Sequence, residues 1–246
     1  MSPSPPALAR ADSPRPAPDP THRLARLDRL LDDLGPALRR GAAAQEARAP
    51  LATGLAALDA QLGGGLALGR ISELCGPPSS GRTSLALALL ARATAEGAVV
   101  AVVDPGDAFH PASAAAAGVA LERVLWARPP ALTPALRCCE RLLQTGGFTA
   151  VWLDTGLGPG PWQALPTAAW QRLARAAAAQ DTALLVGSDA RVTGTQADLA
   201  LELRPARARF AGRPALFEGL ELEVAVARAR RGAGDVPASL LVRAWD

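Results

Sequence analysis

The chain has 246 residues, of which 49% are hydrophobic, so it can form one sizeable domain with a full core and a tail. Its formal net charge of +3 permits a nucleic-acid or acidic protein partner without requiring one. The sequence has no apolar run of membrane-spanning length and no signal-peptide pattern, so we expect a cytoplasmic protein without membrane contact. Its three cysteines lack metal-ligand spacing, and we expect them to be reduced thiols.

The first 49 residues divide into two parts of different composition. Residues 1–20 are rich in proline, alanine and serine, and we expect a disordered tail there. In residues 21–49, leucines recur at spacings of three, four and three, which predicts a helix with one apolar stripe: Leu24, Leu27, Leu31 and Leu34. This stripe either packs on the chain's own core or forms a docking surface for another protein.

Residues 50–246 alternate between apolar runs that predict strands and segments that predict helices. The predicted strands are 70–75, 98–104, 123–127, 149–154 and 182–187, and the predicted helices are about 81–96, 111–117, 132–146 and 162–180. This order predicts an α/β fold with a mostly parallel sheet and helices on both faces. Three further predicted strands in hairpin connections would extend the sheet in antiparallel fashion: 199–203, 220–227 and 239–244.

The segment from Gly76 to Thr83 has the form of a phosphate-binding loop, because it follows a predicted strand and opens a predicted helix. Its backbone N–H groups would bind phosphate at the helix N-terminus. Arg82 stands where such loops carry lysine, and its planar fork differs from a compact ammonium group. Because the chain contains no lysine, codon bias is an alternative reason for this arginine. The residues expected to contact a nucleotide are Gly76, Ser79, Ser80, Gly81, Arg82, Thr83 and Ser84.

A second element of a nucleotide site is the predicted strand that ends in Asp154. An acid in this place holds Mg²⁺ beside the phosphates in P-loop NTPases. A strand that ends in aspartate is common, so its specificity comes from its place after the phosphate loop. If a Mg–nucleotide complex binds, we expect Thr83 and Asp154 to hold the metal.

Over residues 50–246 the sequence resembles the core of the RecA recombinase family. The resemblance is carried by the run from Leu62 to Leu66, by Gly69-Arg70-Ile71, by the phosphate loop and by the segment from Asp104 to Pro111. It implies a RecA-like P-loop NTPase core, with ATP and Mg²⁺ as the ligands of its nucleotide site.

Three positions depart from the family pattern. The glutamate that orients the attacking water falls on Gly106, the tyrosine that stacks on adenine falls on Ser113, and the glutamine that senses the γ-phosphate falls on Ser188. Activation of water requires a positioned base. The resemblance therefore implies a degenerate pseudo-ATPase with no catalytic residues, which requires no cofactor and binds ATP with Mg²⁺ weakly at most.

The regions that would contact DNA or a neighbouring protomer also differ. The loops that bind DNA in the family correspond to short segments here, 156–161 and 189–197, so we expect no more than weak, non-specific DNA contact. Arg228 and Arg230 match basic residues that reach the neighbouring protomer's nucleotide, or they are ordinary charges at a strand end. Four arginines in a predicted hairpin connection are either solvated or contact a phosphate backbone: Arg204, Arg207, Arg209 and Arg213.

In its size, its degenerate nucleotide site and its short DNA loops, the chain is most similar to the ImuA family of mutagenesis accessory proteins. This resemblance implies a non-catalytic role in translesion synthesis induced by DNA damage. RecA and an ImuB-like polymerase homologue would be the partners, with RecA recombination modulated. Two alternatives remain: an active, divergent DNA-dependent ATPase or recombinase, and a SulA-like cell-division inhibitor.

Overall fold

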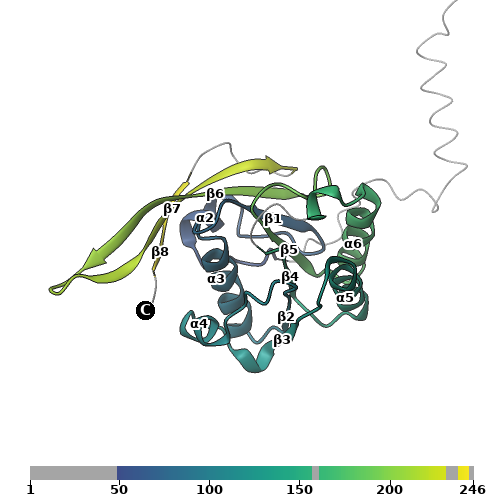
Figure 1. Ribbon diagram of the computed structural model, residues 1–246, viewed down its shortest axis with the longest axis horizontal. Helices are drawn as coiled ribbons and strands as arrows, with labels where there is room; N and C mark the ends of the chain where they lie inside the picture. Colours follow the sequence, from purple (N-terminus) through teal and green to yellow (C-terminus); the bar gives the residue numbers. More distant parts are fainter. Residues whose placement is uncertain (1–48, 157–160, 231–237, 244–246) are drawn as a thin grey trace, which may run out of the picture. The chain divides into compact units, whose positions relative to one another are not determined.

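The computed structural model describes residues 49–156, 161–230 and 238–243 (Figure 1). The predicted tail and the predicted helix within residues 21–49, with its stripe of Leu24, Leu27, Leu31 and Leu34, lie outside the described residues. The described chain forms a sheet of eight strands in the order β3-β2-β4-β5-β1-β6-β7-β8. The strands are β1 (Ile71–Cys75), β2 (Val100–Val103), β3 (Val124–Ala127), β4 (Ala150–Asp154), β5 (Ala183–Ser188), β6 (Leu199–Ala211), β7 (Leu216–Ala229) and β8 (Ala238–Arg243).

The sheet has the mixed topology that the sequence predicts. Each neighbouring pair from β3 to β6 is parallel, whereas β6 pairs with β7 and β7 pairs with β8 in antiparallel fashion. The prediction of a mostly parallel sheet with an antiparallel carboxyl-terminal extension is therefore confirmed.

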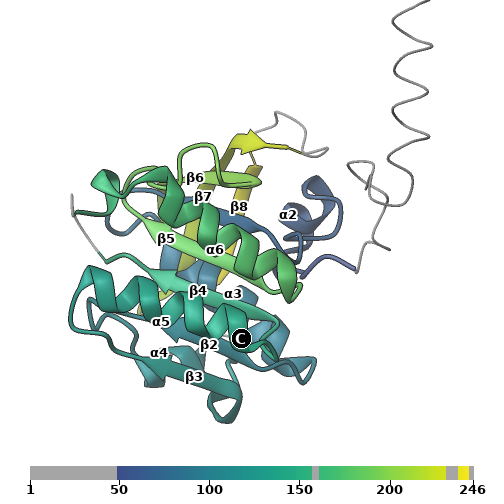
Figure 2. The same ribbon diagram turned by 90° about the vertical axis from the view of Figure 1, so that its right-hand side faces the viewer.

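Helices cover both faces of the parallel part of the sheet (Figures 1 and 2). Alternate residues of each strand face opposite layers, as strand geometry requires. Val100 and Val102 pack with α3 and α4, while Ala101 and Val103 pack with α5 and α6. None of the helices in the described parts of the chain combines the length and the apolar content needed to cross a bilayer. The helices are α2 (Ala56–Gln61), α3 (Arg82–Ala95), α4 (Pro111–Ala116), α5 (Leu132–Thr145) and α6 (Thr167–Ala179), with short 3₁₀ turns η2 (Leu121–Arg123) and η3 (Pro161–Ala164).

The helix predicted over residues 162–180 is wrong in its first part. The structure divides this segment into η3 and α6, and Pro166 lies in an extended conformation immediately before α6. Proline disfavours helical geometry in the residue that precedes it, which here is Leu165. The helix therefore begins after the proline.

The predicted strands 199–203 and 220–227 are too short. The structure extends them into a long hairpin, β6 and β7, which projects from the body of the sheet (Figure 1). Arg204, Arg207 and Arg209 consequently lie on β6, and only Arg213 lies in the connection between the strands. The outer part of this hairpin extends beyond the core, so its Arg/Ala-rich sequence does not alternate between apolar and polar residues. Strand pairing there could not be predicted from the hydrophobic pattern.

The connection between β5 and β6 is fixed by a buried carboxylate. Glu73, in the middle of β1, is fully buried, and its Oε1 atom accepts hydrogen bonds from the backbone N–H groups of Val192 (2.6 Å) and Thr193 (3.1 Å). The hydroxyl of Thr193 donates a third bond of 2.6 Å to Oε2. A buried charge is tolerated only when it is well hydrogen-bonded. The central strand of the sheet thereby holds residues 192–193 in place.

We expect Glu73→Ala to lower the free energy of unfolding by about 3 kcal/mol, because three donors lose their buried acceptor. Urea unfolding followed by circular dichroism measures this change, and hydrogen exchange at Val192 and Thr193 should become faster. The matched control is Glu202→Ala on β6, whose side chain is 42% exposed and lies 3.9 Å from Arg204. This control should change stability by less than about 0.5 kcal/mol. Equal effects of the two substitutions would show that Glu73 does not hold the connection.

Candidate functional site

The segment predicted as a phosphate loop lies at the carboxyl end of β1, between the ends of β5 and β6. Two of its residues adopt left-handed backbone conformations, Ser79 with φ 63° and Gly81 with φ 87°. α3 begins directly afterwards, and Gly81 as its N-cap has no side chain that could satisfy the first N–H groups. These groups and the helix dipole make the start of α3 a place where an anion can bind.

The antiparallel strands leave no room for larger residues in this loop. A Cβ atom on Gly76 would lie 2.4 Å from the carbonyl oxygen of Leu203 on β6. A Cβ atom on Gly81 would lie 2.5 Å from both terminal methyl groups of Leu222 on β7. Gly76 is therefore required by its approach to the backbone of β6, whereas Gly81 is favoured by its left-handed conformation and lies against the Leu222 side chain of β7.

Polar atoms within the loop are buried without a protein partner. Arg82 is only 9% exposed, and its Nη1 atom has no hydrogen-bond partner among the described residues. The Oγ atom of Ser80 is also buried without a partner in the described structure. Thr83, in contrast, is exposed, and Ser84 is half-buried. The start of α3 thus holds a buried cationic group with an unused donor.

Asp154 ends β4 and shares this region with Arg82. Its Oδ1 atom accepts a hydrogen bond of 3.0 Å from the backbone N–H of Gly156. Burial raises the pKa of the Asp154 carboxyl, and Asp104 raises it further, while the Gly156 hydrogen bond and the charge of Arg82 lower it. The charges of Arg82 and Asp104 thus both act on the Asp154 carboxyl at the carboxyl ends of the strands.

Asp104 is occupied by structural hydrogen bonds. It is 1% exposed and accepts bonds from the backbone N–H groups of Ala108 (3.0 Å) and Phe109 (2.9 Å). The indole N–H of Trp126 donates a third bond, of 3.2 Å. These contacts shape the segment after β2, and they engage both oxygen atoms of this carboxylate.

The position that the sequence assigns to a water-orienting acid is Gly106, which has no side chain. The neighbouring Asp107 forms an ion pair of 2.5 Å with Arg128, and both side chains are more than half exposed. The carboxylate of Asp107 is thus directed to a surface arginine. Between β2 and α4, both carboxylates, Asp104 and Asp107, are therefore engaged by other protein groups.

The other two departures from the family pattern also have local roles. Ser188 is fully buried at the end of β5, opposite Cys75 in the strand register, with its Oγ atom 3.9 Å from the cysteine sulfur. Burial raises the pKa of the Cys75 thiol to about 12, so the thiol remains protonated at neutral pH. On α4, the backbone N–H of Ser113 donates to Nδ1 of His110.

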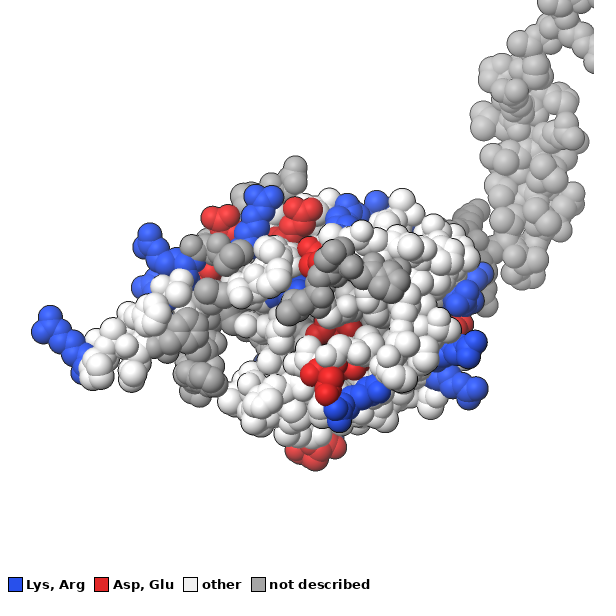
Figure 3. All heavy atoms as spheres, in the orientation of Figure 1, with Lys and Arg blue, Asp and Glu red and all other residues white. Residues whose placement is uncertain are grey.

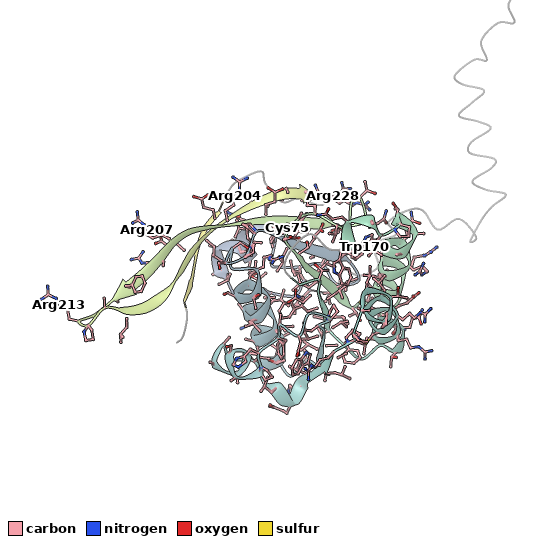
Figure 4. All side chains as sticks on the ribbon, viewed as in Figure 1. Cys75, Trp170, Arg204, Arg207, Arg213 and Arg228 are labelled. Atoms are coloured by element: carbon pink, nitrogen blue, oxygen red, sulfur yellow. The ribbon has the colours of Figure 1, made fainter. Side chains whose placement is uncertain are left out.

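Arg228 and Arg230 lie at the other end of the sheet from the phosphate loop. Arg228 donates from Nε to the carbonyl oxygen of Ala197 at 3.0 Å, and Arg230 donates to the carbonyl oxygen of Thr195. β7 pairs there with the start of β6, next to the amino end of β1 (Figure 4). Contact with a neighbouring protomer through these arginines stays a prediction. Arg230 also borders a hollow of about 460 Å³, whose other lining residues are Gly69, Arg70, Ile71, Gln171, Ala174, Arg175, Gln196 and Asp198.

The hairpin carries the basic side chains that the sequence analysis grouped together (Figures 3 and 4). Arg209 forms an ion pair of 2.5 Å with Glu221, whereas Arg207 and Arg213 form none with the described residues. Near the end of the hairpin, Phe210 is 62% exposed and Leu216 is 68% exposed. The hairpin thus presents positive charge and apolar surface together, and the sequence analysis did not single out Phe210 and Leu216.

No group of three or more His, Cys, Asp or Glu side chains in the described parts of the chain is placed to hold a metal ion. The sequence-predicted nucleotide residues from Gly76 to Ser84 and Asp154 do lie together at one edge of the sheet. Sequence reasoning missed the structural use of Asp104 and Glu73. The one signal for Glu73 is an acid inside an otherwise apolar strand.

Comparison with known proteins identifies relatives with the same core. The RecA protein of Rubrobacter xylanophilus is 39% identical over 122 residues, which cover 49% of this chain and 36% of that protein. The RecA protein of Chlorobium chlorochromatii is 42% identical over 106 residues, or 43% of this chain and 30% of that protein. The chain thus spans about a third of the length of these curated relatives.

A solved structure shares the fold. The crystal structure of the RadB recombinase superposes with a TM-score of 0.61 and 23% sequence identity, over 77% of this chain and 94% of that chain. The sequence model of the RecA N-terminal domain matches residues 26–161. Because this match covers more than half of the chain, the protein belongs to the RecA N-terminal domain family.

Proposed function

We propose that this chain is a non-hydrolysing member of the RecA family that acts by binding other proteins. The observation that carries the proposal is the arrangement of carboxylates after β2. Gly106 offers no side chain, Asp104 accepts three structural hydrogen bonds, and Asp107 pairs with Arg128. Hydrolysis needs a group that positions or deprotonates the attacking water. After β2, neither Asp104 nor Asp107 is free to do this, and Gly106 has no side chain.

The end of β5 supports the same proposal. A longer amide side chain at this position could donate a hydrogen bond to the γ-phosphate. Ser188 is instead short and buried, and its hydroxyl lies near Cys75. Charge that develops on a transferred phosphoryl group needs donors already placed around it. With neither a base nor this donor, the loop would serve binding at most.

The protein's role would be that of an accessory factor in translesion synthesis induced by DNA damage. In this proposal it belongs with the ImuA proteins and binds RecA, an ImuB-like polymerase homologue, or both. The short connection between β5 and β6 supports a role apart from strand exchange, since Glu73 fixes residues 192–193. Nucleic acid would be contacted weakly and without sequence preference through Arg207 and Arg213, in a salt-sensitive manner.

We expect no appreciable ATP hydrolysis by the purified protein, with or without single-stranded DNA. A coupled phosphate-release assay measures this, with RecA as the positive control. Arg82→Lys alone should remain inactive, because the water-positioning acid is still missing. The double variant with Arg82→Lys and Gly106→Glu should hydrolyse ATP faster than either single variant. A Cβ at position 106 meets nothing closer than 3.7 Å, so the glutamate can be accommodated. Turnover by the unmodified chain at the rate of RecA would refute the proposal.

We also expect the leucine stripe of residues 21–49 to bind RecA. A stripe at helical spacing can fill an apolar groove on a partner. Leu27→Asp combined with Leu31→Asp should abolish capture of RecA in a pull-down, while circular dichroism shows an unchanged core. Arg29→Asp, outside the stripe, is the matched control and should bind normally. Normal binding by the double variant, or an unfolded core, would exclude the stripe as a docking surface.

A further inference from the structure

The hollow of about 460 Å³ beside Arg230 lies at the amino end of β1, away from the phosphate loop. Backbone hydrogen bonds fix the wall that the strands form. The carbonyl oxygen of Ile71 accepts the N–H of Asp198, and the carbonyl oxygen of Asp198 accepts the N–H of Arg230, each at 2.9 Å. Small-molecule sites commonly occupy about 300–1,000 Å³. The hollow therefore has a preformed wall and the size of such a site.

The facing wall is one side of α6. Gln171, Ala174 and Arg175 are spaced by three and four residues, which places them on the same face of the helix. Ala174 is short, and Gly69 on the strand side has no side chain. The longer polar side chains of Gln171 and Arg175 are exposed. The two small residues thus leave space between polar groups that come from different elements.

The lining of the hollow carries an excess of positive charge. Arg70, Arg175 and Arg230 come from three separate segments of the chain, and Asp198 is the acid among the lining residues. None of these four side chains forms an ion pair with a described residue. Arg230 donates to the carbonyl oxygen of Thr195, which braces the wall. Arg70 and Arg175 keep their guanidinium donors available for a ligand.

The chemistry of this lining selects one class of ligand. A guanidinium fork binds phosphate oxygens in bidentate fashion, and a phosphate monoester brings a charge of about −1.5 to −2. The half-buried Asp198 carboxylate can only accept hydrogen bonds when it is ionised, so it requires a donor on the ligand. A sugar phosphate carries both the anion and the hydroxyl donors.

We propose that this hollow binds a small phosphate monoester with hydroxyl groups. Arg70 and Arg175 hold the phosphate, and Asp198 accepts a hydrogen bond from a hydroxyl group. The amide of Gln171 lies on the same helix face as Arg175 and adds a neutral donor. This site goes beyond the proposed function and does not depend on whether the phosphate loop hydrolyses ATP.

Isothermal titration of the full chain with ribose 5-phosphate, in a buffer free of phosphate, tests the proposal. We expect a dissociation constant below about 1 mM, weakened about tenfold by Arg70→Ala and by Arg175→Ala. Arg172→Ala is the matched control on the same helix, because Nε of Arg172 lies 3.4 Å from Glu140 and the residue does not line the hollow. Its affinity should agree with that of the unmodified chain within about twofold. No binding by the unmodified chain, or equal affinities in all variants, would overturn the proposal.

Asp198→Ala tests the requirement for a hydroxyl donor. The dissociation constant of ribose 5-phosphate should rise about threefold, because the hydroxyl group loses its acceptor. Inorganic phosphate has no sugar hydroxyl group, so its affinity should increase by a similar factor when the neighbouring negative charge is removed. Stronger binding of both ligands would show that Asp198 only repels the anion, which contradicts its assigned role.

A single-stranded oligonucleotide distinguishes the two sources of phosphate. Each of its phosphodiesters carries one negative charge and lacks the free phosphate end that two guanidinium groups can share. We therefore expect that the oligonucleotide does not displace ribose 5-phosphate from the full chain. Displacement that is lost in Arg175→Ala would assign the hollow to a nucleic-acid backbone and overturn the proposal of a small ligand.

Discussion

Close packing between the phosphate loop and the antiparallel strands is the constraint on which the site depends. A Cβ atom on Gly76 would meet the backbone of Leu203, and one on Gly81 would meet the side chain of Leu222 and would also be strained by the left-handed backbone of that residue. Arg82, the first residue of α3, is buried beside this loop. The extension formed by β6 and β7 is therefore part of the site, because it determines where the loop can lie.

Buried charge explains how the remaining acids are used. In a low-dielectric interior each ionised group needs hydrogen bonds or an opposite charge. Glu73 obtains them from residues 192–193, and Asp104 obtains them from Ala108, Phe109 and Trp126. Both acids thereby hold connections at the carboxyl end of the sheet in fixed conformations. Arg82 and Asp154 are left as the opposite charges around the loop.

A fold shared with recombinases does not by itself fix the chemistry of this protein. The chain belongs to the RecA N-terminal domain family, and the RadB structure has the same fold at low sequence identity. At the carboxyl ends of the strands, the positions that the resemblance assigned to a glutamate and a glutamine hold Gly106 and the buried Ser188.

The sequence by itself determined the parallel sheet, its helices on both faces and the place of the phosphate loop, because period-two and helical hydrophobic patterns and the loop spacing are local properties. The sequence also indicated that Gly76–Ser84 and Asp154 lie at the same edge of the sheet, because the carboxyl ends of parallel strands meet there. Only the tertiary structure decided that Asp104 and Glu73 are structural acids, that Arg82 is buried with an unused donor, and that the arginine group follows a projecting strand. Glu73 contacts a residue 120 positions away in the chain, and Leu203 and Leu222 reach the loop through sheet pairing. Contacts at such separations depend on register and packing, which no local pattern records.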